Sequence, residues 1–231
     1  MAFGYAQCAE APQGKGGDEM DLKDGLNALL PVARTMLGLD SDELERLGPV
    51  DLTILFTDIE NYSRAADKLG DESAHEIVRA HNRIVRRALR RYGGHEVKHT
   101  GDGIMAYFLA AGRALAAAVE IERRIEEHNR RGQGPQLQVR IGINSGEPIV
   151  ERGDLYGTPV IVASRIVDLA GGEQILVSDV VRQLAAGKGF VFRPLGRVQL
   201  EGIRDPVRLY EVDWRQSRLP EPEPKAKGAR D

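Results

Sequence analysis

The chain has very little cysteine and no long hydrophobic run. Cys8 is the only thiol among 231 residues, so no disulfide can form within one chain, which fits a reducing compartment. No apolar stretch approaches the roughly 20 residues that span a bilayer, and the start has no signal-peptide pattern. We therefore expect a cytoplasmic protein that does not enter a membrane.

Neither sign of charge is in large excess. The formal net charge of −3 excludes a global basic footprint for nucleic acid. Five arginines between 83 and 91 are interleaved with Leu and Val, and we interpret them as a solvated helix face. Hydrophobic residues make up 42% and charged residues 29% of the chain, as in a soluble globular domain with a good-sized core.

The composition divides the chain into four parts. Residues 1–22 lack periodicity and are expected to be a disordered leader. Residues 23–46 contain an apolar helical stripe that Pro31 interrupts; this helix either makes a dimer contact or covers the core. One folded domain is expected over 50–213, followed by a tail over 214–231 that is rich in Pro, Glu and Lys and predicted to be disordered.

Within the folded domain, hydrophobic periodicity predicts alternating strands and helices. Strands are expected at 50–57, 95–99, 104–108, 137–144, 174–177, 190–195 and 207–212, and helices at 61–69, 72–92, 114–131, 156–169 and 179–186. Asp-Gly at 102–103 separates two apolar runs, which is a strong hairpin signal. The order predicts an α/β or α+β sheet with helices packed on it.

Two carboxylates occupy unusual places in this pattern. Asp58 ends a buried apolar strand, where an unpaired carboxylate costs several kcal/mol. Asp102 lies between Gly101 and Gly103, which allow a ligand to approach the backbone. Each alone is commonly a helix cap or a turn residue. Together on neighbouring strands they would form an oxygen site for magnesium or manganese.

Several motifs in order resemble those of one known family. Residues 56–63 (FTDIENYS) and 97–106 (VKHTGDGIMA) resemble the two metal-binding motifs of class III adenylyl and guanylyl cyclases. Residues 153–157 (GDLYG) and 162–166 (VASRI) are similar to that family's base-recognition segment and transition-state helix. The resemblance extends over about 50–212. It implies an α+β fold, a ferredoxin-like βαββαβ-type sheet with helices packed on it.

The resemblance also implies an activity and its metal ions. It implies an adenylate cyclase that converts ATP to 3′,5′-cyclic AMP and pyrophosphate with two Mg²⁺ or Mn²⁺ ions per active site. Asp58 and Asp102 would hold both ions, assisted by the backbone carbonyl of Ile59. The loop at the entry of the following helix would offer backbone N–H groups to the phosphates. That loop comprises Asn61, Tyr62 and Ser63.

The remaining implied roles concern the base and the transition state. Lys98 and Asp154 correspond to the base-selecting pair, a combination that accompanies adenine in the family. Asp154 can accept from the exocyclic amine, whereas a guanine keto oxygen would face it without a donor. Arg165 would stabilise charge on the α-phosphate. Sites would form at a homodimer interface, with Asp58 and Asp102 from one subunit and the other three residues from its partner.

Two positions depart from the family pattern. Ile161 stands where the family has Asn, which orients the ribose, and we expect turnover about 10- to 100-fold slower. Glu201 stands where the family has Lys, although Arg204 lies close by. Two alternatives therefore stay open: a degenerate domain that binds nucleotide as a regulatory module, and a cyclase with altered base choice. Pro159 is expected in the first turn of a helix that starts near Thr158.

Other chemistry-bearing residues are interpreted without a functional role. Gly-Gly-Asp-Glu at 16–19 matches the start of the diguanylate cyclase signature but lies in the unpatterned leader. His75 and His81 are not spaced i, i+4, and we expect both to be solvated surface residues. His99 is next to Lys98, and strand alternation predicts that it points away from the site.

Overall fold

The computed structural model describes residues 50–219 except 63–65, 68–69 and 133. The predicted leader, the helical segment 23–46 and residues 220–231 lie outside the described residues. Of the helix predicted at 61–69, only Asn61, Tyr62, Ala66 and Asp67 are described, and the last three have helical conformation.

Nine strands and four helices follow one another along the described residues. They are β1 (Leu52–Ile59), α4 (Asp71–Tyr92), β2 (His95–His99), β3 (Ile104–Phe108), α5 (Ala111–Arg131), β4 (Val139–Gly146), β5 (Ile149–Glu151), β6 (Asp154–Tyr156), α6 (Thr158–Leu169), β7 (Gln174–Ser178), α7 (Asp179–Leu184), β8 (Phe192–Val198) and β9 (Val207–Val212). Seven of the strands form one sheet in the order β2-β3-β1-β4-β7-β9-β8, and β5 pairs with β6 separately.

The strand order confirms the predicted ferredoxin-like unit. The elements β1-α4-β2-β3-α5-β4 follow the βαββαβ sequence, and their strands lie in the order β2-β3-β1-β4. Strand β1 is antiparallel to both β3 and β4, whereas β4 and β7 are parallel. Strands β7, β9 and β8 extend the sheet beyond this unit. The predicted hairpin is also present, since the Thr100 N–H donates to the Gly103 carbonyl at 3.1 Å.

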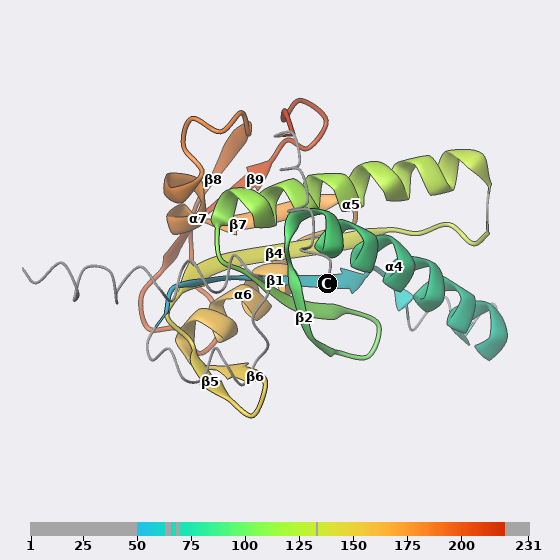
Figure 1. Cartoon of the computed structure of the whole chain (residues 1–231), viewed down its shortest axis with the longest axis horizontal. Helices are drawn as coiled ribbons and strands as arrows, with labels where there is room; N and C mark the ends of the chain where they lie inside the picture. Colours follow the sequence, from blue (N-terminus) through green and yellow to red (C-terminus); the bar gives the residue numbers. More distant parts are fainter. Residues whose placement is uncertain (1–49, 63–65, 68–69, 133, 220–231) are drawn as a thin grey trace, which may run out of the picture.

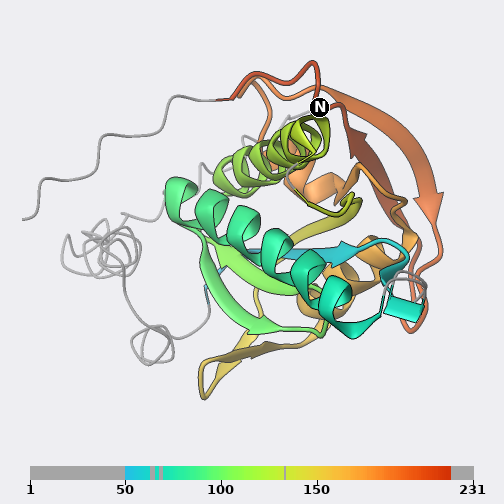
Figure 2. The same cartoon turned by 90° about the vertical axis from the view of Figure 1, so that its right-hand side faces the viewer.

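The sheet has helices on both faces (Figures 1 and 2). Helices α4 and α5 lie side by side over one face, with α7 beside them, while α6 and the β5–β6 hairpin lie on the other. Alternate residues of β1 serve the two layers: Leu55 and Ile59 pack under α4 and α5, and Ile54 and Phe56 pack under α6. By this alternation, Asp58 faces the α6 side.

The β5–β6 hairpin was not predicted. Its strands have three residues each, too few to produce a recognisable alternation of polar and apolar residues. The helix predicted from 156 therefore begins two residues later, at Thr158, and Pro159 lies in its first turn as expected. The turn that separates β6 from α6 uses Gly157, whose φ of 99° favours glycine.

The chain continues to pack against the domain after the predicted boundary at 213. Trp214 and Ser217 are 4% and 2% exposed, and the Trp214 indole N–H donates to the Glu173 carbonyl at 2.8 Å. The Arg123 guanidinium on α5 donates to the carbonyls of both Trp214 and Ser217. Because these contacts come from distant parts of the chain, the polar composition after 213 gave no sign of them.

Candidate active site

The turn that carries Asp102 lies against the end of β1. A Cβ atom added to Gly103 would meet the Thr57 carbonyl oxygen at 2.1 Å, so only glycine allows this approach. Thr57 pairs with Ile104 across β1 and β3, which brings the Asp102 and Asp58 carboxyl groups close together. The two aspartates predicted as metal ligands therefore share one corner of the sheet.

Crowding of the two carboxyl groups changes their electrostatics. Partial burial raises the pKa of Asp102, and repulsion from the neighbouring Asp58 raises it further, while Arg140 opposes both effects. Two crowded carboxylates are stabilised by a cation between or beside them. Their oxygen donors suit a hard divalent ion such as Mg²⁺ or Mn²⁺.

Arg140 supplies a positive charge at this corner. It lies opposite Asp58 in the β1–β4 pairing, and its Nε and one terminal nitrogen contact the same Asp58 oxygen at 2.6 and 2.5 Å. Sequence reasoning assigned no role to Arg140. The strand register decides that it faces Asp58, and register was not part of the sequence prediction.

His81 lies directly beneath the site and is not a surface residue as predicted. It is fully buried on α4, and its Nε2 is 3.1 Å from the Thr57 hydroxyl. That hydroxyl oxygen accepts from the Ile104 N–H at 3.1 Å. The burial of His81 was not predicted because α4 is rich in charged residues. The helix is amphipathic, and His81 lies on its inner face. His75 on the same helix is exposed, as expected.

Acid is expected to destabilise the fold through His81. Burial lowers the pKa of His81 from 6.5 to about 4, so the folded state holds the neutral ring. The stabilisation is complete above pH 6.5 and is lost as the pH falls towards 4, a change of about 3 kcal/mol. Urea unfolding between pH 7.5 and 4.5 measures it. His81→Gln should flatten the acid slope, whereas His75→Gln should leave it unchanged; equal slopes in all three proteins would contradict this assignment.

A second pair of charged groups joins β2 to the β5–β6 hairpin. The Lys98 ammonium donates to the Asp154 carboxylate at 2.5 Å, and it lies 5.7 Å from the centre of the Tyr156 ring. Burial would raise the pKa of Asp154, but hydrogen bonds from Lys98, from the Leu155 N–H and from Tyr156 outweigh it and lower that pKa. Asp154 is therefore held as a carboxylate beside a cation.

The neighbour of Lys98 in β2 has other partners. The His99 ring lies 3.1 Å from the Arg86 guanidinium, which also makes two hydrogen bonds to Glu96. Lys98 and His99 therefore engage different groups, as the predicted alternation requires.

Arg165 on α6 is held by acidic neighbours. Its guanidinium contacts the Asp168 carboxylate at 3.3 Å, and it lies 3.9 Å from the Glu201 carboxylate. Its Nε also donates to the Glu201 carbonyl at 3.3 Å. Ile161, one helical turn earlier, is 45% exposed. Both positions that depart from the family pattern therefore lie next to Arg165, either in contact or on the same helix face.

A series of hydrogen bonds connects Arg165 to Asp58. Arg140 donates hydrogen bonds both to Asp58 and, at 3.4 Å, to the main-chain carbonyl of Asp168. The side-chain carboxylate of Asp168 in turn accepts a hydrogen bond from Arg165. Helix α6 can approach β4 this closely because Gly142 has no side chain; a Cβ there would meet the Val167 nitrogen at 2.4 Å.

The predicted phosphate loop is described only in part. Asn61 is exposed with a φ of 57°, a left-handed conformation that asparagine tolerates. Tyr62 packs against the core under α4 and α5, and Ser63 lies outside the described residues. Ile59 is buried at the end of β1.

Comparison with known proteins decides the family. The family model of the adenylate and guanylate cyclase catalytic domain matches residues 47–213. The chain belongs to this family.

Related proteins agree with this assignment of the cyclase domain. An adenylate cyclase of Mycosarcoma maydis is 32% identical over 180 residues, covering 67% of this chain and 7% of that protein. A putative adenylate cyclase 3 of Rhizobium meliloti is 28% identical over 160 residues, covering 68% of this chain and 27% of that protein. A solved adenylate/guanylate cyclase/hydrolase structure from Silicibacter pomeroyi is 31% identical, with a TM-score of 0.63 over 71% of this chain and 96% of that chain.

The cyclase domain spans a small part of the curated relatives, as the 7% and 27% coverages show. No helix in the described part of the chain has the length and hydropathy to cross a membrane. The described residues contain no cluster of three or more His, Cys, Asp or Glu side chains that could hold a metal ion. Two carboxylates nevertheless fit Mg²⁺, which commonly takes one or two of them and completes its shell with water and substrate phosphates.

Proposed function

We propose that this cyclase domain is an adenylate cyclase, which forms 3′,5′-cyclic AMP and pyrophosphate from ATP in a homodimer with two Mg²⁺ or Mn²⁺ ions per site. The observation that carries the proposal is that a pair of carboxylates and a separate ion pair lie on one face of the sheet. Asp58 and Asp102 form the acidic corner, and Lys98 and Asp154 form the ion pair.

The proposed reaction breaks one bond and forms another at the α-phosphorus. The ribose 3′-hydroxyl loses its proton to water, its oxygen attacks the α-phosphorus in line, the α–β phosphoanhydride bond breaks, and pyrophosphate leaves with the released electron pair. Asp58 and Asp102 would hold the metal ions, which when bound lower the pKa of the 3′-hydroxyl and neutralise the triphosphate. Arg165 would contact the α-phosphate oxygens as negative charge develops there. Positioning therefore dominates the work of the protein.

The choice of adenine rests on Lys98 and Asp154. The carboxylate of Asp154 can accept from the adenine amine, and the Lys98 ammonium can donate to a ring nitrogen. The keto oxygen of guanine would face a carboxylate and repel it. The low pKa of Asp154 keeps this acceptor ionised at neutral pH.

A shared site at a dimer interface is supported by the position of Arg165. Within one chain, Arg165 forms ion pairs with Asp168 and Glu201 and not with Asp58 or Asp102. The Asp58 carboxylate is paired with Arg140 instead. A two-fold dimer would bring Lys98, Asp154 and Arg165 of one protomer to the acidic corner of its partner and form two equivalent sites.

Turnover of ATP, GTP, CTP and UTP by purified protein, with Mn²⁺ and then Mg²⁺, tests the proposal. Cyclic AMP and pyrophosphate from ATP alone are expected. A cyclic pyrimidine product would favour the altered-base alternative. ATP binding without any product would favour the degenerate regulatory domain, for which Ile161 and Glu201 are the supporting residues.

Glu201→Lys is expected to lower the KM for ATP about 3- to 10-fold. The glutamate carboxylate competes with the triphosphate for Arg165, and reversing its charge removes that competitor and adds attraction in a partly exposed setting. Steady-state kinetics measure the change. Glu76→Lys on α4 makes the same charge change at another exposed position and should leave KM unaltered. An unchanged KM in Glu201→Lys would contradict the competition.

Ile161→Asn is expected to raise kcat about 10-fold. The side chain at 161 is 45% exposed and four residues before Arg165 on α6, so asparagine fits without disturbing the core and supplies a hydrogen bond to the ribose. Leu169→Asn, at a 49% exposed position of the same helix, is the matched control. If both variants behave alike, polarity on α6 rather than ribose contact explains the result.

A further inference from the structure

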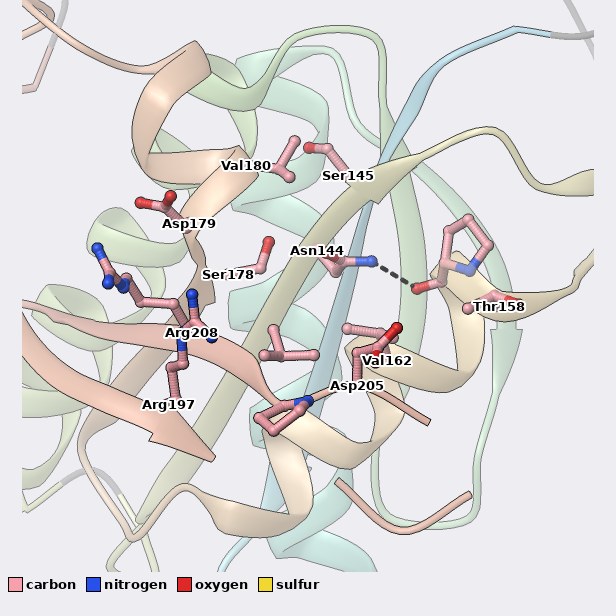
Figure 3. A pocket seen from close by; sticks show the side chains of 13 residues that line it. Asn144, Ser145, Thr158, Val162, Ser178, Asp179, Val180, Arg197, Asp205 and Arg208 are labelled. Atoms are coloured by element: carbon pink, nitrogen blue, oxygen red, sulfur yellow. Dashed lines mark hydrogen bonds between the residues drawn. The ribbon is translucent and has the colours of Figure 1, made fainter. Parts of the chain in front are cut away.

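An open cavity of about 780 Å³ lies beyond the ends of β4 and β7, away from the acidic corner. Figure 3 shows side chains from β4, α6, β7, α7, β8 and β9 around it. Asn144 lines it, four residues along β4 from Arg140, which is about 13 Å at the rise of a strand. The cavity is therefore separate from the site around Asp58.

The topology of the sheet explains why a cavity occurs here. Strands β4 and β7 are parallel, and α6 connects them across one face. The cavity lies at the carboxyl ends of these two strands, where Asn144, Ser178 and the first turn of α6 line it. In sheets with parallel strands, ligands bind outside these carboxyl ends. The volume also falls within the range of small-molecule sites.

Two arginines line one side of the cavity without an acidic partner. Arg197 on β8 and Arg208 on β9 are directly opposite each other in the antiparallel pairing, and like charges in that arrangement repel. Among the described residues neither side chain has a hydrogen bond or ion pair. Arg193, also on β8, is by contrast paired with Asp213. An oxyanion between Arg197 and Arg208 would relieve the repulsion and accept from both.

A buried hydroxyl in the same lining also lacks a partner. Ser178 is 2% exposed, and its side-chain oxygen makes no hydrogen bond. Figure 3 shows it among the lining side chains, between Asp179 and Asn144. A buried polar group is normally hydrogen-bonded, so the missing partner is expected from a ligand or from its hydration.

The two aspartates in the lining differ in their availability. The Asp179 carboxylate is already engaged by Arg182 and Gln183, each at 2.7 Å. Asp205 lies across the cavity, near Val162 (Figure 3), and makes no ion pair with any described residue. The cavity therefore has two arginines on one side, apolar side chains in the middle and the Asp205 carboxylate on the other side. Because this carboxylate would repel an anion, the part of a ligand that lies beside Asp205 must be neutral or donate a hydrogen bond.

We propose that this cavity binds a small organic phosphate. The phosphate group lies between Arg197 and Arg208, the carbon skeleton lies along Val162 and Val207, and a hydroxyl of the ligand donates to Asp205. The proposal is independent of the cyclase reaction, because none of these residues belongs to the proposed active site.

Binding of ribose 5-phosphate to the metal-free protein, measured by calorimetry and by ³¹P line broadening, tests this proposal. Saturable binding is expected. Arg197→Gln and Arg208→Gln should each weaken it at least about 10-fold, since each removes a charge-assisted hydrogen bond. Ser178→Ala should weaken it severalfold. Circular dichroism and thermal unfolding check that each variant is folded.

Two control variants locate the binding. Arg79→Gln removes an exposed arginine from α4, and Arg165→Gln changes the active-site side of α6; neither should alter the affinity. Equal weakening by Arg79→Gln would show unspecific charge attraction, and loss with Arg165→Gln would place the ligand in the active site; either result overturns the proposal. Inorganic phosphate should bind more weakly than ribose 5-phosphate. Equal affinity, or no saturable binding of the sugar phosphate, also overturns it.

Discussion

Asp58→Asn and Asp102→Asn are each expected to reduce metal-dependent turnover by about 1,000-fold or more while the protein stays folded. Asparagine keeps the shape of the side chain but removes the charge that holds the metal ions, and their contribution to transition-state stabilisation is several kcal/mol. ATP turnover with Mn²⁺ measures the loss.

The same two variants should change the metal-free protein in opposite directions. Asp58→Asn leaves the Arg140 guanidinium without its carboxylate and should lower the thermal unfolding temperature. Asp102→Asn removes a partly buried carboxyl group whose pKa is raised by burial and by repulsion from Asp58, and it should raise that temperature.

One control and one contrary outcome sharpen this test. Asp71→Asn, in the exposed first turn of α4, removes a carboxylate of the same type and should retain turnover. Full activity in either Asp58→Asn or Asp102→Asn would show that the two-metal assignment is wrong, whatever the stability of the variants.

Mixing Asp58→Asn chains with Arg165→Ala chains is expected to restore activity that neither variant has alone. If each site combines Asp58 of one protomer with Arg165 of the other, a mixed dimer has one site with both defects and one intact site. Random pairing in an equal mixture makes about half of the dimers mixed, so about a quarter of the wild-type activity should return.

The control for this mixture uses two changes in the same half-site. Asp58→Asn mixed with Asp102→Asn should restore nothing, because every site then keeps at least one defect in its acidic corner. Two affinity tags confirm that mixed dimers have formed. Confirmed mixed dimers of Asp58→Asn with Arg165→Ala that stay inactive would contradict the shared site.

The acidic corner was predicted from two local signals together with the resemblance to the cyclase family. Asp58 follows an unbroken apolar strand, and Asp102 lies in an Asp-Gly turn between two apolar runs. Those signals place Asp58 at the end of a strand and Asp102 in a turn, and the structure brings the two side chains together. It likewise brings together Lys98 and Asp154. Their catalytic and base-selecting roles stay predictions.

The partners of these residues could not be predicted in the same way. Arg140 reaches Asp58 only through the register of β4 against β1, and a shift of one residue would point it to the opposite face. Glu201 meets Arg165 through the packing of α6 near the loop between β8 and β9. His81 was misplaced because one polar residue on the inner face of a charged helix looks like its exposed neighbours.

The sequence by itself determined the order of the longer helices and strands through hydrophobic periodicity and turn chemistry, which are local. The ferredoxin-like unit and the set of site residues were inferred from the resemblance of several motifs to the cyclase family. Tertiary structure alone decided the ion pairs of Asp58 and Arg165, the burial of His81 and Trp214, and the meeting of Arg197, Arg208 and Ser178 at one cavity. Each depends on strand register and helix packing, which join residues far apart in the chain and leave no periodic mark in it.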